Sequence, residues 1–490
     1  MTAGRIMVQG TMSGAGKSLL VTALCRIFHQ DGYRTAPFKS QNMALNSFIT
    51  KDGREMGRAQ VLQALSAGKE PDVRMNPILL KPTGDTGSQV IVNGRVYGDY
   101  RAADYFKIKK SLIPRILESY ESLASENDII VIEGAGSPAE INLKKDDIVN
   151  MGLAELVNAP VILAGDIDPG GVFAQIYGTI KLLEPKEQSR IIGTVINKFR
   201  GDPEILRPGL SMLEELTGIP VLGVVPYLHL ELDEEDSLTG AFQRRDADRP
   251  VDIAVIRLPR ISNFTDFTPL SLHPSLGVRY VSDVKHLGNP DLIILPGTKN
   301  TMEDLMWLRQ NGLEARIVRL AASGTPVLGI CGGFQMLGES LSDPEGAEHG
   351  GEMRGMRLLP ARTVFSKKKT QTQTTAVCAA PFAGARIRGY QIHMVQTTTD
   401  GAEPFCILEE GRTDGARRGN VFGTYLHGLF DTGHLTEALA SWLCQRKGIA
   451  PESESPGDYD SFREGQLDLL AETVRGSLDM QAIYRAVARY

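Results

Sequence analysis

The stretch GTMSGAGKS, residues 10–18, stands between a short apolar run at residues 5–9 and a helical pattern over residues 17–29. Consecutive backbone N–H groups in such a glycine-rich turn, together with the N-terminus of the helix, can surround a polyphosphate. In this kind of loop the lysine, here Lys17, reaches the outer phosphates, and the hydroxyl of Ser18 holds Mg²⁺. The strand before the loop and the helix after it therefore predict a nucleotide site at the start of an α/β domain.

The spacing of this loop departs from the usual motif by one residue. Five residues separate Gly10 from Gly16, and Thr11 stands where the first glycine belongs. Further candidates follow strands, because the carboxyl ends of parallel strands face the ligand crevice. Glu133, at the end of DIIVIE, is expected to orient the metal, with a solvated carboxylate as the alternative. Asn197, at the end of IIGTVIN, is expected either to contact the adenine edge or to lie in a surface turn.

Val- and Ile-rich runs alternate with helical patterns along the whole chain, which predicts an α/β fold with two doubly wound, mostly parallel sheets. The first series of runs is at residues 5–9, 128–134, 161–166, 191–197 and 220–226, with helices at 17–29, 150–157 and 173–183. The second series is at residues 251–259, 291–297, 326–333 and 421–428, with helices at 302–309 and 435–445.

A polar stretch at residues 231–250, acidic and then basic, separates the two series and is typical of a linker. The predicted domains are therefore residues 1–235 and 251–447. Residues 448–490 form a tail, in which Leu467, Leu469, Leu470 and Val474 have helical spacing. We expect a terminal helix there, and an exposed loop at the polar tract KKKTQTQTT, residues 367–375.

Composition limits the function further. The chain has 490 residues, 42% of them hydrophobic, and its 53 Lys and Arg against 59 Asp and Glu give a net charge of −6. This balance argues against nucleic-acid binding through an evenly basic surface and favours a small anionic or neutral substrate. With no run of eighteen apolar residues and no signal pattern, we expect a cytoplasmic protein. The five cysteines contain no CxxC pair, so neither a zinc site nor disulfides are expected.

Cys331 is the one cysteine in a reactive context. It lies in GICGG at the junction of an apolar strand and a helix, and a nucleophile on so sharp a turn needs small neighbours. The N-terminus of the helix also favours the thiolate. His427, directly after another strand, is the expected base, and the amides of Gly297 and Gly332 are expected to form an oxyanion hole.

The first half of the chain resembles the dethiobiotin synthetase family of ATP-dependent ligases, through its loop spacing and the EGAG at residues 133–136. The resemblance implies that ATP phosphorylates a carboxyl or carbamate group, and that a nitrogen then attacks the mixed anhydride. It also implies that Lys39 in APFKSQN is a second lysine for phosphates and that Glu55 in REMGRAQ contacts Mg²⁺. Met12 stands where partition-type ATPases have an extra lysine, which argues against an ATPase switch.

The second half resembles the class I glutamine amidotransferase family, through GICGG, YLHG and LPGTKN. The resemblance implies that the cysteine attacks the glutamine carboxamide, that ammonia leaves, and that water hydrolyses the thioester. Most members have Glu two residues after the histidine, where this chain has Leu429. The expected glutaminase is therefore a Cys331–His427 dyad, as in the cobyric and cobyrinic acid synthase branch.

Phrases across nearly the whole chain resemble the cobyric acid synthase family in particular: PFKSQNMALNS, EMGRAQ, NPILLKP, GDIDPGGVFAQ, VINKFRGD, LPRISNFTDFTPL and GYQIHM. The resemblance implies ATP- and glutamine-dependent amidation of the b, d, e and g carboxylates of adenosylcobyrinic acid a,c-diamide, giving adenosylcobyric acid. Gln391 replaces the usual Glu and Pro169 the usual Arg, and neither belongs to the dyad.

The implied partners are the small molecules ATP, glutamine and a corrinoid, with no nucleic acid and no membrane, and a homo-oligomer stays open. The residues expected to bind nucleotide are Thr11, Gly14, Ala15, Gly16, Lys17, Ser18, Lys39 and Asn197. The residues expected to hold Mg²⁺ are Ser18, Glu55 and Glu133.

Three alternatives stay open at the level of sequence. Cobyrinic acid a,c-diamide synthase has the same chemistry but lacks the phrase SQNMALNS, and CTP synthase should keep the glutamate that Leu429 replaces. A non-catalytic nucleotide-binding regulatory module, with a degenerate amidotransferase domain, is the third. Glutamine hydrolysis would distinguish that module from the enzymes.

Overall fold

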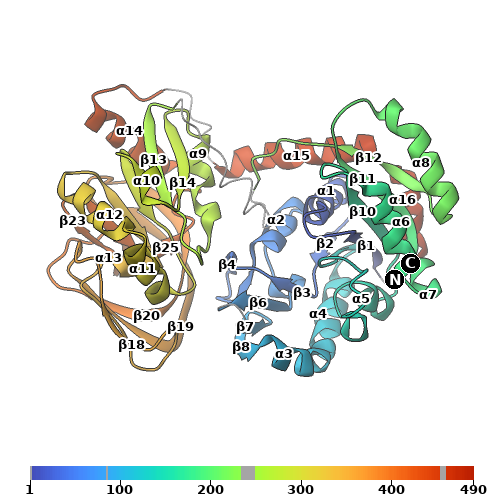
Figure 1. Ribbon diagram of the computed structural model, residues 1–490, viewed down its shortest axis with the longest axis horizontal. Helices are drawn as coiled ribbons and strands as arrows, with labels where there is room; N and C mark the ends of the chain where they lie inside the picture. The colour runs from blue at the N-terminus through green and yellow to red at the C-terminus, as the bar shows by residue number, and fades with distance from the viewer. Residues whose placement is uncertain (1–2, 84–86, 233–248, 453–458) are drawn as a thin grey trace. The chain divides into compact units, whose positions relative to one another are not determined.

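The computed structural model describes residues 3–83, 87–232, 249–452 and 459–490, which form two compact units (Figure 1). The first contains the described residues of Met1–Ala44, Glu55–Asp236 and Arg463–Tyr490. The second contains those of Leu45–Arg54 and Ser237–Phe462. Most of the predicted linker, residues 233–248, lies outside the described residues.

The first unit is built on a six-stranded sheet in which every neighbouring pair is parallel. Its strands, in spatial order, are β12 (Val221–Pro226), β11 (Ile191–Phe199), β10 (Val161–Asp166), β1 (Gly4–Gly10), β9 (Ile129–Glu133) and β2 (Thr35–Phe38). Because β1 lies in the middle with later strands added on both sides, the sheet is doubly wound, as predicted. The carboxyl ends of β1 and β9 lie side by side, with Val8 opposite Glu133.

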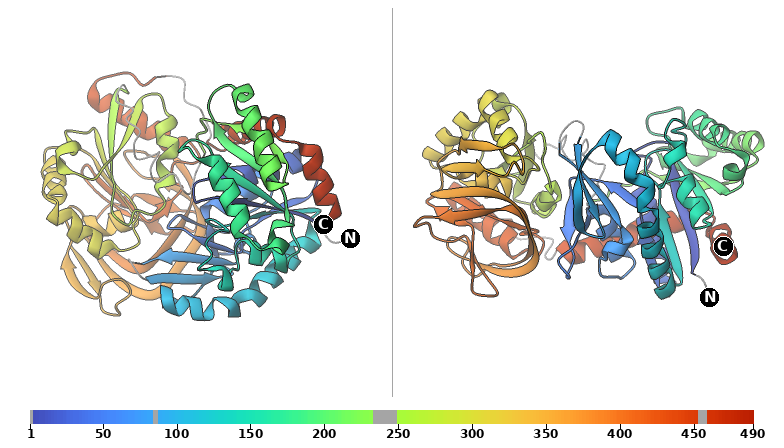
Figure 2. Two further views of the ribbon diagram at one scale, coloured as in Figure 1. Left: turned by 45° about the vertical axis from the view of Figure 1, so that its right-hand side comes forward. Right: turned by 90° about the horizontal axis from the view of Figure 1, so that it is seen from below.

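Helices cover the faces of this sheet (Figure 2). The helices of the first unit that precede its last segment are α1 (Lys17–Gln30), α2 (Arg58–Ser66), α3 (Ala102–Ile108), α4 (Ile113–Glu126), α5 (Met151–Leu156), α6 (Val172–Leu182), α7 (Pro185–Gln188) and α8 (Pro203–Thr217). Ile6 and Val8 of β1 pack with α1 in one buried cluster, whereas Met7 between them points to the opposite face and is equally buried. Burial of both faces explains the continuous apolar runs of these strands.

The tail of the chain completes this core. The expected terminal helix is α15 (Tyr459–Ser477), and a second helix, α16 (Met480–Arg489), follows it after a break at Leu478–Asp479. Leu467, Leu470 and Val474 of α15 pack in the same cluster as Ile6 and Val8. The tail is therefore part of the hydrophobic core of the first unit.

A smaller sheet with mixed strand directions also belongs to the first unit. Its strands, in spatial order, are β3 (Gln41–Met43), β6 (Ile78–Pro82), β7 (Gly87–Val92) and β8 (Arg95–Arg101). The short strand β5 (Glu55–Gly57) directly precedes α2. The short 3-10 turns of the unit are η1 (Val73–Met75), η2 (Lys109–Leu112) and η3 (Lys144–Asp146).

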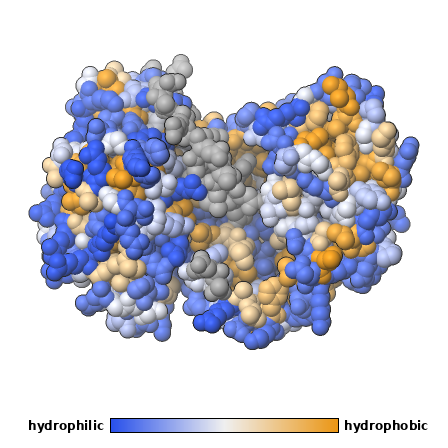
Figure 3. Space-filling model, in the orientation of Figure 1, coloured by the Kyte–Doolittle hydropathy of each residue, from blue (hydrophilic) through white to orange (hydrophobic). Residues whose placement is uncertain are grey.

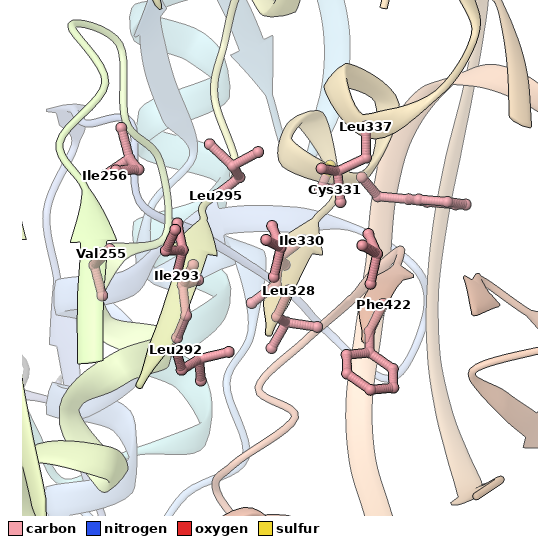
Figure 4. Close-up of a cluster of buried hydrophobic side chains, with 14 of the residues drawn as sticks. Val255, Ile256, Leu292, Ile293, Leu295, Leu328, Ile330, Cys331, Leu337 and Phe422 are labelled. Carbon is pink, nitrogen blue, oxygen red and sulfur yellow. The ribbon is translucent and has the colours of Figure 1, made fainter. Parts of the chain in front are cut away.

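The second unit is built on another six-stranded sheet, parallel except for one edge strand. In spatial order its strands are β14 (Leu276–Val281), β13 (Val251–Ile256), β15 (Leu292–Leu295), β16 (Val327–Ile330), β24 (Val421–Thr424) and β23 (Ala416–Arg418). Its helical elements are η5 (Phe264–Phe267), α9 (Thr268–Leu272), α10 (Val284–Leu287), α11 (Thr301–Gln310), α12 (Leu313–Ala322), α13 (Gly332–Leu337) and α14 (His434–Lys447). Figure 4 shows Cys331 at the end of β16, next to Leu337 of α13. The expectation of two doubly wound, mostly parallel sheets is thus confirmed.

A second sheet in this unit contains two long antiparallel strands. Its strands are β18 (Gly351–Arg354), β17 (Ser340–Asp343), β19 (Ala361–Cys378), β20 (Arg386–Thr399) and β25 (Leu426–His427), with β21 (Cys406–Leu408) paired to β19 and β22 (Thr413–Asp414) paired to β21. The tract KKKTQTQTT lies inside β19, so the predicted exposed loop is wrong. Thr370 pairs with His393, and every residue from Thr370 to Val377 pairs with β20. Threonine fits an extended backbone well, and pairing with a strand that is distant in sequence explains why a polar tract forms one here.

On its surface the first unit presents large apolar side chains along α8. Ile205, Met212 and Leu216 are exposed on this helix, whereas Leu213 is buried, and Figure 3 shows apolar surface in this region. In the part of the chain that the structure describes, no helix is both long enough and apolar enough to span a membrane.

Candidate functional site

The glycine-rich loop wraps closely around its neighbours at the N-terminus of α1. Gly16 precedes the helix with a φ of 84°, a left-handed conformation that favours glycine. A Cβ atom on Gly16 would lie 2.1 Å from Nδ2 of Asn197, so a side chain at this position would clash. The Asn197 amide also donates to the Ala15 carbonyl at 2.9 Å. The structure therefore places Asn197 directly against the loop, and its contact with adenine remains a prediction.

Lys17 is folded back over the loop. Its Nζ donates to the carbonyl oxygens of Met12, at 2.9 Å, and Gly136, at 3.1 Å, and the residue is 6% exposed. Carbonyl oxygens carry partial negative charge, so these contacts hold the ammonium group within a loop of the type that binds phosphate. Gly136 ends the EGAG phrase, which connects this lysine to the end of β9.

Glu133 brings together two residues that the sequence had singled out, Ser18 and Lys39. Its Oε1 accepts a hydrogen bond from Ser18 Oγ at 2.8 Å and pairs with Lys39 Nζ, also at 2.8 Å. Gln63 Nε2 donates to Oε2 at 2.5 Å. The ammonium group of Lys39 and the hydroxyl of Ser18 in the glycine-rich loop thus meet at the carboxylate of Glu133, at the end of β9.

The charge state of Glu133 follows from these contacts. Burial raises the pKa of its carboxyl group, but the Lys39 ammonium and the hydrogen bonds from Gln63 and Ser18 outweigh burial, and the net shift is downward. Glu133 is therefore ionised at neutral pH. A carboxylate and a hydroxyl oxygen are the hard donors that Mg²⁺ prefers, and Mg²⁺ takes its other ligands from phosphates and water. Ser18 and Glu133 fit such a site by the chemistry of their donors.

No group of three or more His, Cys, Asp or Glu side chains that could hold a metal by themselves is found among the described residues. Glu55 lies at the start of β5, 0% exposed, with its Oε1 2.8 Å from Lys81 Nζ. Its role as a metal contact stays a prediction. Thr11 Oγ1 lies 3.2 Å from Gln175 Oε1, at the other side of the loop.

Lys198 also contacts the loop, although no separate role was predicted for it from the sequence. Its Nζ donates to the Gly14 carbonyl at 2.6 Å and pairs with Asp166 Oδ2 at 2.8 Å. Its φ of 62° is unusual for a residue other than glycine, and surrounding contacts must hold it there. Asp166 ends β10, and Lys198 lies one residue before the end of β11, so its position near a strand end was the available signal.

In the second unit, Cys331 occupies a strained turn between β16 and α13. Its φ and ψ are 52° and −109°, and its N–H donates to the Thr424 carbonyl at 2.8 Å. A Cβ atom on Gly333 would lie 1.9 Å from the Leu295 carbonyl oxygen, so only glycine lets the helix pack this closely on β15. Backbone strain at a nucleophile is typical of such elbows. The predicted geometry around Cys331 is present.

His427 lies between Cys331 and a carboxylate that the sequence analysis missed. Its imidazole interacts with the Cys331 side chain, and its Nδ1 lies 2.6 Å from Asp266 Oδ2. Asp266 Oδ1 accepts the Gly428 N–H at 3.0 Å, and the aspartate is 3% exposed. Leu429, at the position of the usual glutamate, is fully buried. Asp266 therefore takes the position of a third residue next to the Cys331–His427 pair. It comes from the phrase ISNFTDF, which is distant from His427 in the sequence.

This arrangement sets the charge of the histidine. Burial alone would lower the pKa of His427, but the Asp266 carboxylate and Cys331 raise it well above its ordinary value. A protonated imidazole next to the cysteine stabilises a thiolate, the nucleophilic form of the side chain. The Cys331 thiolate can attack a carbonyl carbon, and protonated His427 can then give its proton to the leaving nitrogen.

Gly297 and Gly332, predicted to form the oxyanion hole, both lie close to Cys331 and His427. A Cβ atom on Gly297 would be 3.0 Å from Cε1 of His427, and one on Gly332 would be 3.1 Å from the N atom of Thr298, the residue after Gly297. Both backbone turns therefore meet beside the nucleophile. Their donation to an oxyanion stays a prediction.

Comparison with known proteins finds a known domain family in each half of the chain. Residues 6–237 match the CobQ/CobB/MinD/ParA nucleotide binding domain, and residues 252–435 match the CobB/CobQ-like glutamine amidotransferase domain. The chain is similar to cobyric acid synthases of Ruminiclostridium cellulolyticum, with 55% identity over 98% of this chain and 96% of the relative, and of Clostridium acetobutylicum, with 52% identity over 98% of both. A cobyric acid synthase of Streptococcus sanguinis is 52% identical over 99% of both chains. The chain therefore belongs to the cobyric acid synthase family of glutamine-dependent amidoligases.

Proposed function

We propose that this protein amidates the b, d, e and g carboxylates of adenosylcobyrinic acid a,c-diamide, using ATP and glutamine, to give adenosylcobyric acid. The observation that carries the proposal is similarity to cobyric acid synthases over 98% of the chain, which includes both sites. Residues 1–235 would activate the carboxylates, residues 251–447 would release ammonia, and residues 448–490 would be structural. ATP and glutamine are cytoplasmic metabolites, which agrees with the expected location.

In the glutaminase half, the Cys331 thiolate attacks the carboxamide carbon of glutamine. The N–H groups of Gly297 and Gly332 stabilise the oxyanion of the tetrahedral intermediate. His427, held by Asp266, gives its proton to the leaving nitrogen, so that ammonia departs and a thioester remains. Water then hydrolyses the thioester to glutamate. The buried His427–Asp266 contact and the strained turn at Cys331 support these roles.

In the synthetase half, a substrate carboxylate oxygen attacks the γ-phosphorus of ATP, and ADP leaves with the β–γ bridging oxygen. Lys17 and Lys39 neutralise charge on the phosphates and orient them for in-line transfer. Ser18 and Glu133 would hold Mg²⁺, which supplies further charge neutralisation when bound. Ammonia then attacks the acyl phosphate, and inorganic phosphate leaves as the carboxamide forms. The meeting of Ser18 and Lys39 at Glu133 supports this assignment.

Mass spectrometry of the corrinoid tests the proposed function directly. The protein is incubated with MgATP, glutamine and adenosylcobyrinic acid a,c-diamide, and each carboxyl group converted to a carboxamide lowers the mass by about one unit. A product lighter by about four units is expected for four amidations. An unchanged corrinoid with brisk turnover of ATP and glutamine would point to another carboxylate substrate. No turnover at all would favour the non-catalytic module.

Substitution of Asp266 tests the carboxylate on the histidine. We expect Asp266→Asn to lower kcat for glutamine hydrolysis by about 10² to 10⁴, because the amide neither orients nor stabilises an imidazolium. The measurement is glutamate release over a range of pH. Asp266 raises the pKa of His427. In the variant, the alkaline limb of the pH profile of glutamine hydrolysis should therefore shift to lower pH.

The matched control is Asp400→Asn, the same chemical change at an exposed position. It should leave hydrolysis unchanged, and amidation driven by ammonium salts should survive in both variants. If Asp266→Asn hydrolysed glutamine at the normal rate with an unaltered pH profile, a dyad without the carboxylate would be sufficient.

A further inference from the structure

A segment from the first half of the sequence lies inside the second unit. Leu45–Arg54, here called the inserted segment, contains β4 (Ser47–Ile49) and belongs to the second unit, although the chain on both sides of it belongs to the first. Asn46 and Ser47 are only 4% and 1% exposed, and the Ile49 carbonyl accepts a hydrogen bond from Gln373 of β19 at 2.6 Å. Buried polar groups need hydrogen-bond partners, so the partners of Asn46 and Ser47 indicate what the inserted segment does.

One set of contacts holds the turn that presents Asp266. The Asn263 N–H donates to Asn46 Oδ1 at 2.7 Å, and the Ser47 N–H donates to Asn263 Oδ1 at 3.3 Å. Asn263 has a φ of 54°, and its carbonyl accepts the Asp266 N–H at 3.0 Å. A left-handed residue other than glycine persists only where its surroundings hold it. Asn46 is thus part of what fixes the turn whose carboxylate binds His427.

A second set of contacts reaches His427 from β20. The Tyr390 hydroxyl donates to the Ser47 carbonyl at 2.9 Å and accepts from Asn263 Nδ2 at 2.8 Å. The Tyr390 ring stacks on the imidazole of His427, with ring centres 5.5 Å apart and planes inclined by 23°. Phe48 of the inserted segment packs edge-on against the same tyrosine, at 5.3 Å. The hydroxyl and ring contacts of Tyr390 therefore link the inserted segment to the histidine.

We propose that the inserted segment positions the histidine of the glutaminase, with Asn46 acting through Asp266 and Ser47 acting through Tyr390. Asn46 and Tyr390 are positioning residues in this proposal, because they act on His427 rather than on glutamine. The inference rests on the proposed function in assigning glutamine hydrolysis to Cys331 and His427. It makes the glutaminase site dependent on ten residues, 45–54, that precede its own stretch of sequence by about 200 positions.

In the reaction, the contacts of the inserted segment affect the orientation of the His427 imidazole. Proton transfer from His427 to the leaving nitrogen needs an aligned imidazole, and small displacements of a catalytic group are costly. The titratable groups that act on His427 are Asp266 on η5, Cys331 at the start of α13 and His393 on β20. Loss of the Asn46 contact should weaken the Asp266–His427 bond. Since that bond favours protonated His427, its weakening should shift the alkaline limb of activity to lower pH.

The test compares Asn46→Ala with Asn46→Asp in the full-length protein. Asn46→Ala removes the acceptor for Asn263 N–H, and we expect kcat for glutamate release to fall roughly 10- to 100-fold with KM within about twofold. The alkaline limb should move to lower pH in the same variant. Asn46→Asp keeps an oxygen acceptor and should recover most of kcat. Tyr390→Phe, which keeps the stacked ring and loses only the hydroxyl bonds, should give an intermediate kcat.

Lys51→Ala, an exposed change within the inserted segment, is the matched control and should leave kcat unchanged. Ammonium-driven amidation of the corrinoid should be normal in all variants. Wild-type kcat and pH profile in Asn46→Ala would overturn the proposal, and so would equal losses with glutamine and ammonium, which indicate a damaged fold. If the wild-type protein released glutamate without amidating the corrinoid, the proposed substrate would fail while the variants still decided the role of the inserted segment.

Discussion

Lys17→Ala is expected to remove amidation with glutamine and with ammonium salts alike, by a factor of at least about 10³. Lys17 is 6% exposed and already held over the loop by the Met12 and Gly136 carbonyls. With ATP bound, its ammonium group would face the phosphates, where charge develops as the phosphoryl group is transferred. Alanine supplies no charge and no donor there, whichever nitrogen source is present. The measurement is ADP release together with the mass of the corrinoid.

Glutamine hydrolysis by the same variant is its internal control, because Cys331 and His427 belong to the other compact unit and the protein should still release glutamate. Lys181→Ala, the same change at an exposed lysine of α6, should leave both activities intact. Undiminished amidation by Lys17→Ala would refute the assigned phosphate loop. Loss of glutamate release in both lysine variants would indicate that the assay, not the loop, had failed.

The parts of the fold that the sequence predicts well are those determined by local patterns. Strands buried on both faces leave continuous apolar runs, and amphipathic helices leave 3.6-residue spacing, so α1, predicted over residues 17–29, extends over Lys17–Gln30. The same holds for α6 and α11, each within one residue of the prediction at either end. The glycines of both loops also allowed the two turns to be predicted from the sequence. The structure explains why glycine is needed there, because a side chain at Gly16 or Gly333 would clash with its neighbours.

What the sequence could not provide are contacts between residues that are far apart in the chain. Asp266 contacts His427 although the two residues are 161 positions apart in the sequence. The segment around Asp266 contains no feature that distinguishes a hydrogen-bond partner of histidine from a helix-capping aspartate. The tract at residues 367–375 becomes a strand because β20 pairs with it. Asn46 lies in a phrase that resembles the family, yet only the fold reveals that it contacts Asn263. Each of these misses is a tertiary contact that overrides local pattern.

Cys331→Ser is expected to produce the other large effect, and a more selective one. Glutamine hydrolysis and glutamine-driven amidation should fall by at least about 10⁴, because a serine hydroxyl next to protonated His427 is not ionised and is a poor nucleophile. Amidation with ammonium salts should persist within about twofold, since the proposed acyl phosphate would form in the other unit, beside Lys17, and would accept ammonia from solution. The measurement is corrinoid mass with each nitrogen source, assayed at alkaline pH where free ammonia is abundant.

The selectivity of that loss is what assigns the two reactions to two sites. Cys444→Ser, the same replacement at a buried cysteine of α14, should leave both nitrogen sources effective and controls for the exchange of sulfur for oxygen. If a folded Cys331→Ser variant lost both nitrogen sources equally, ammonia release and carboxylate activation would not be separable, and the division of labour would be wrong. If it lost only glutamine, the strained turn at Cys331 would be the source of ammonia alone, and Lys17 and Glu133 would retain the whole of the activation chemistry.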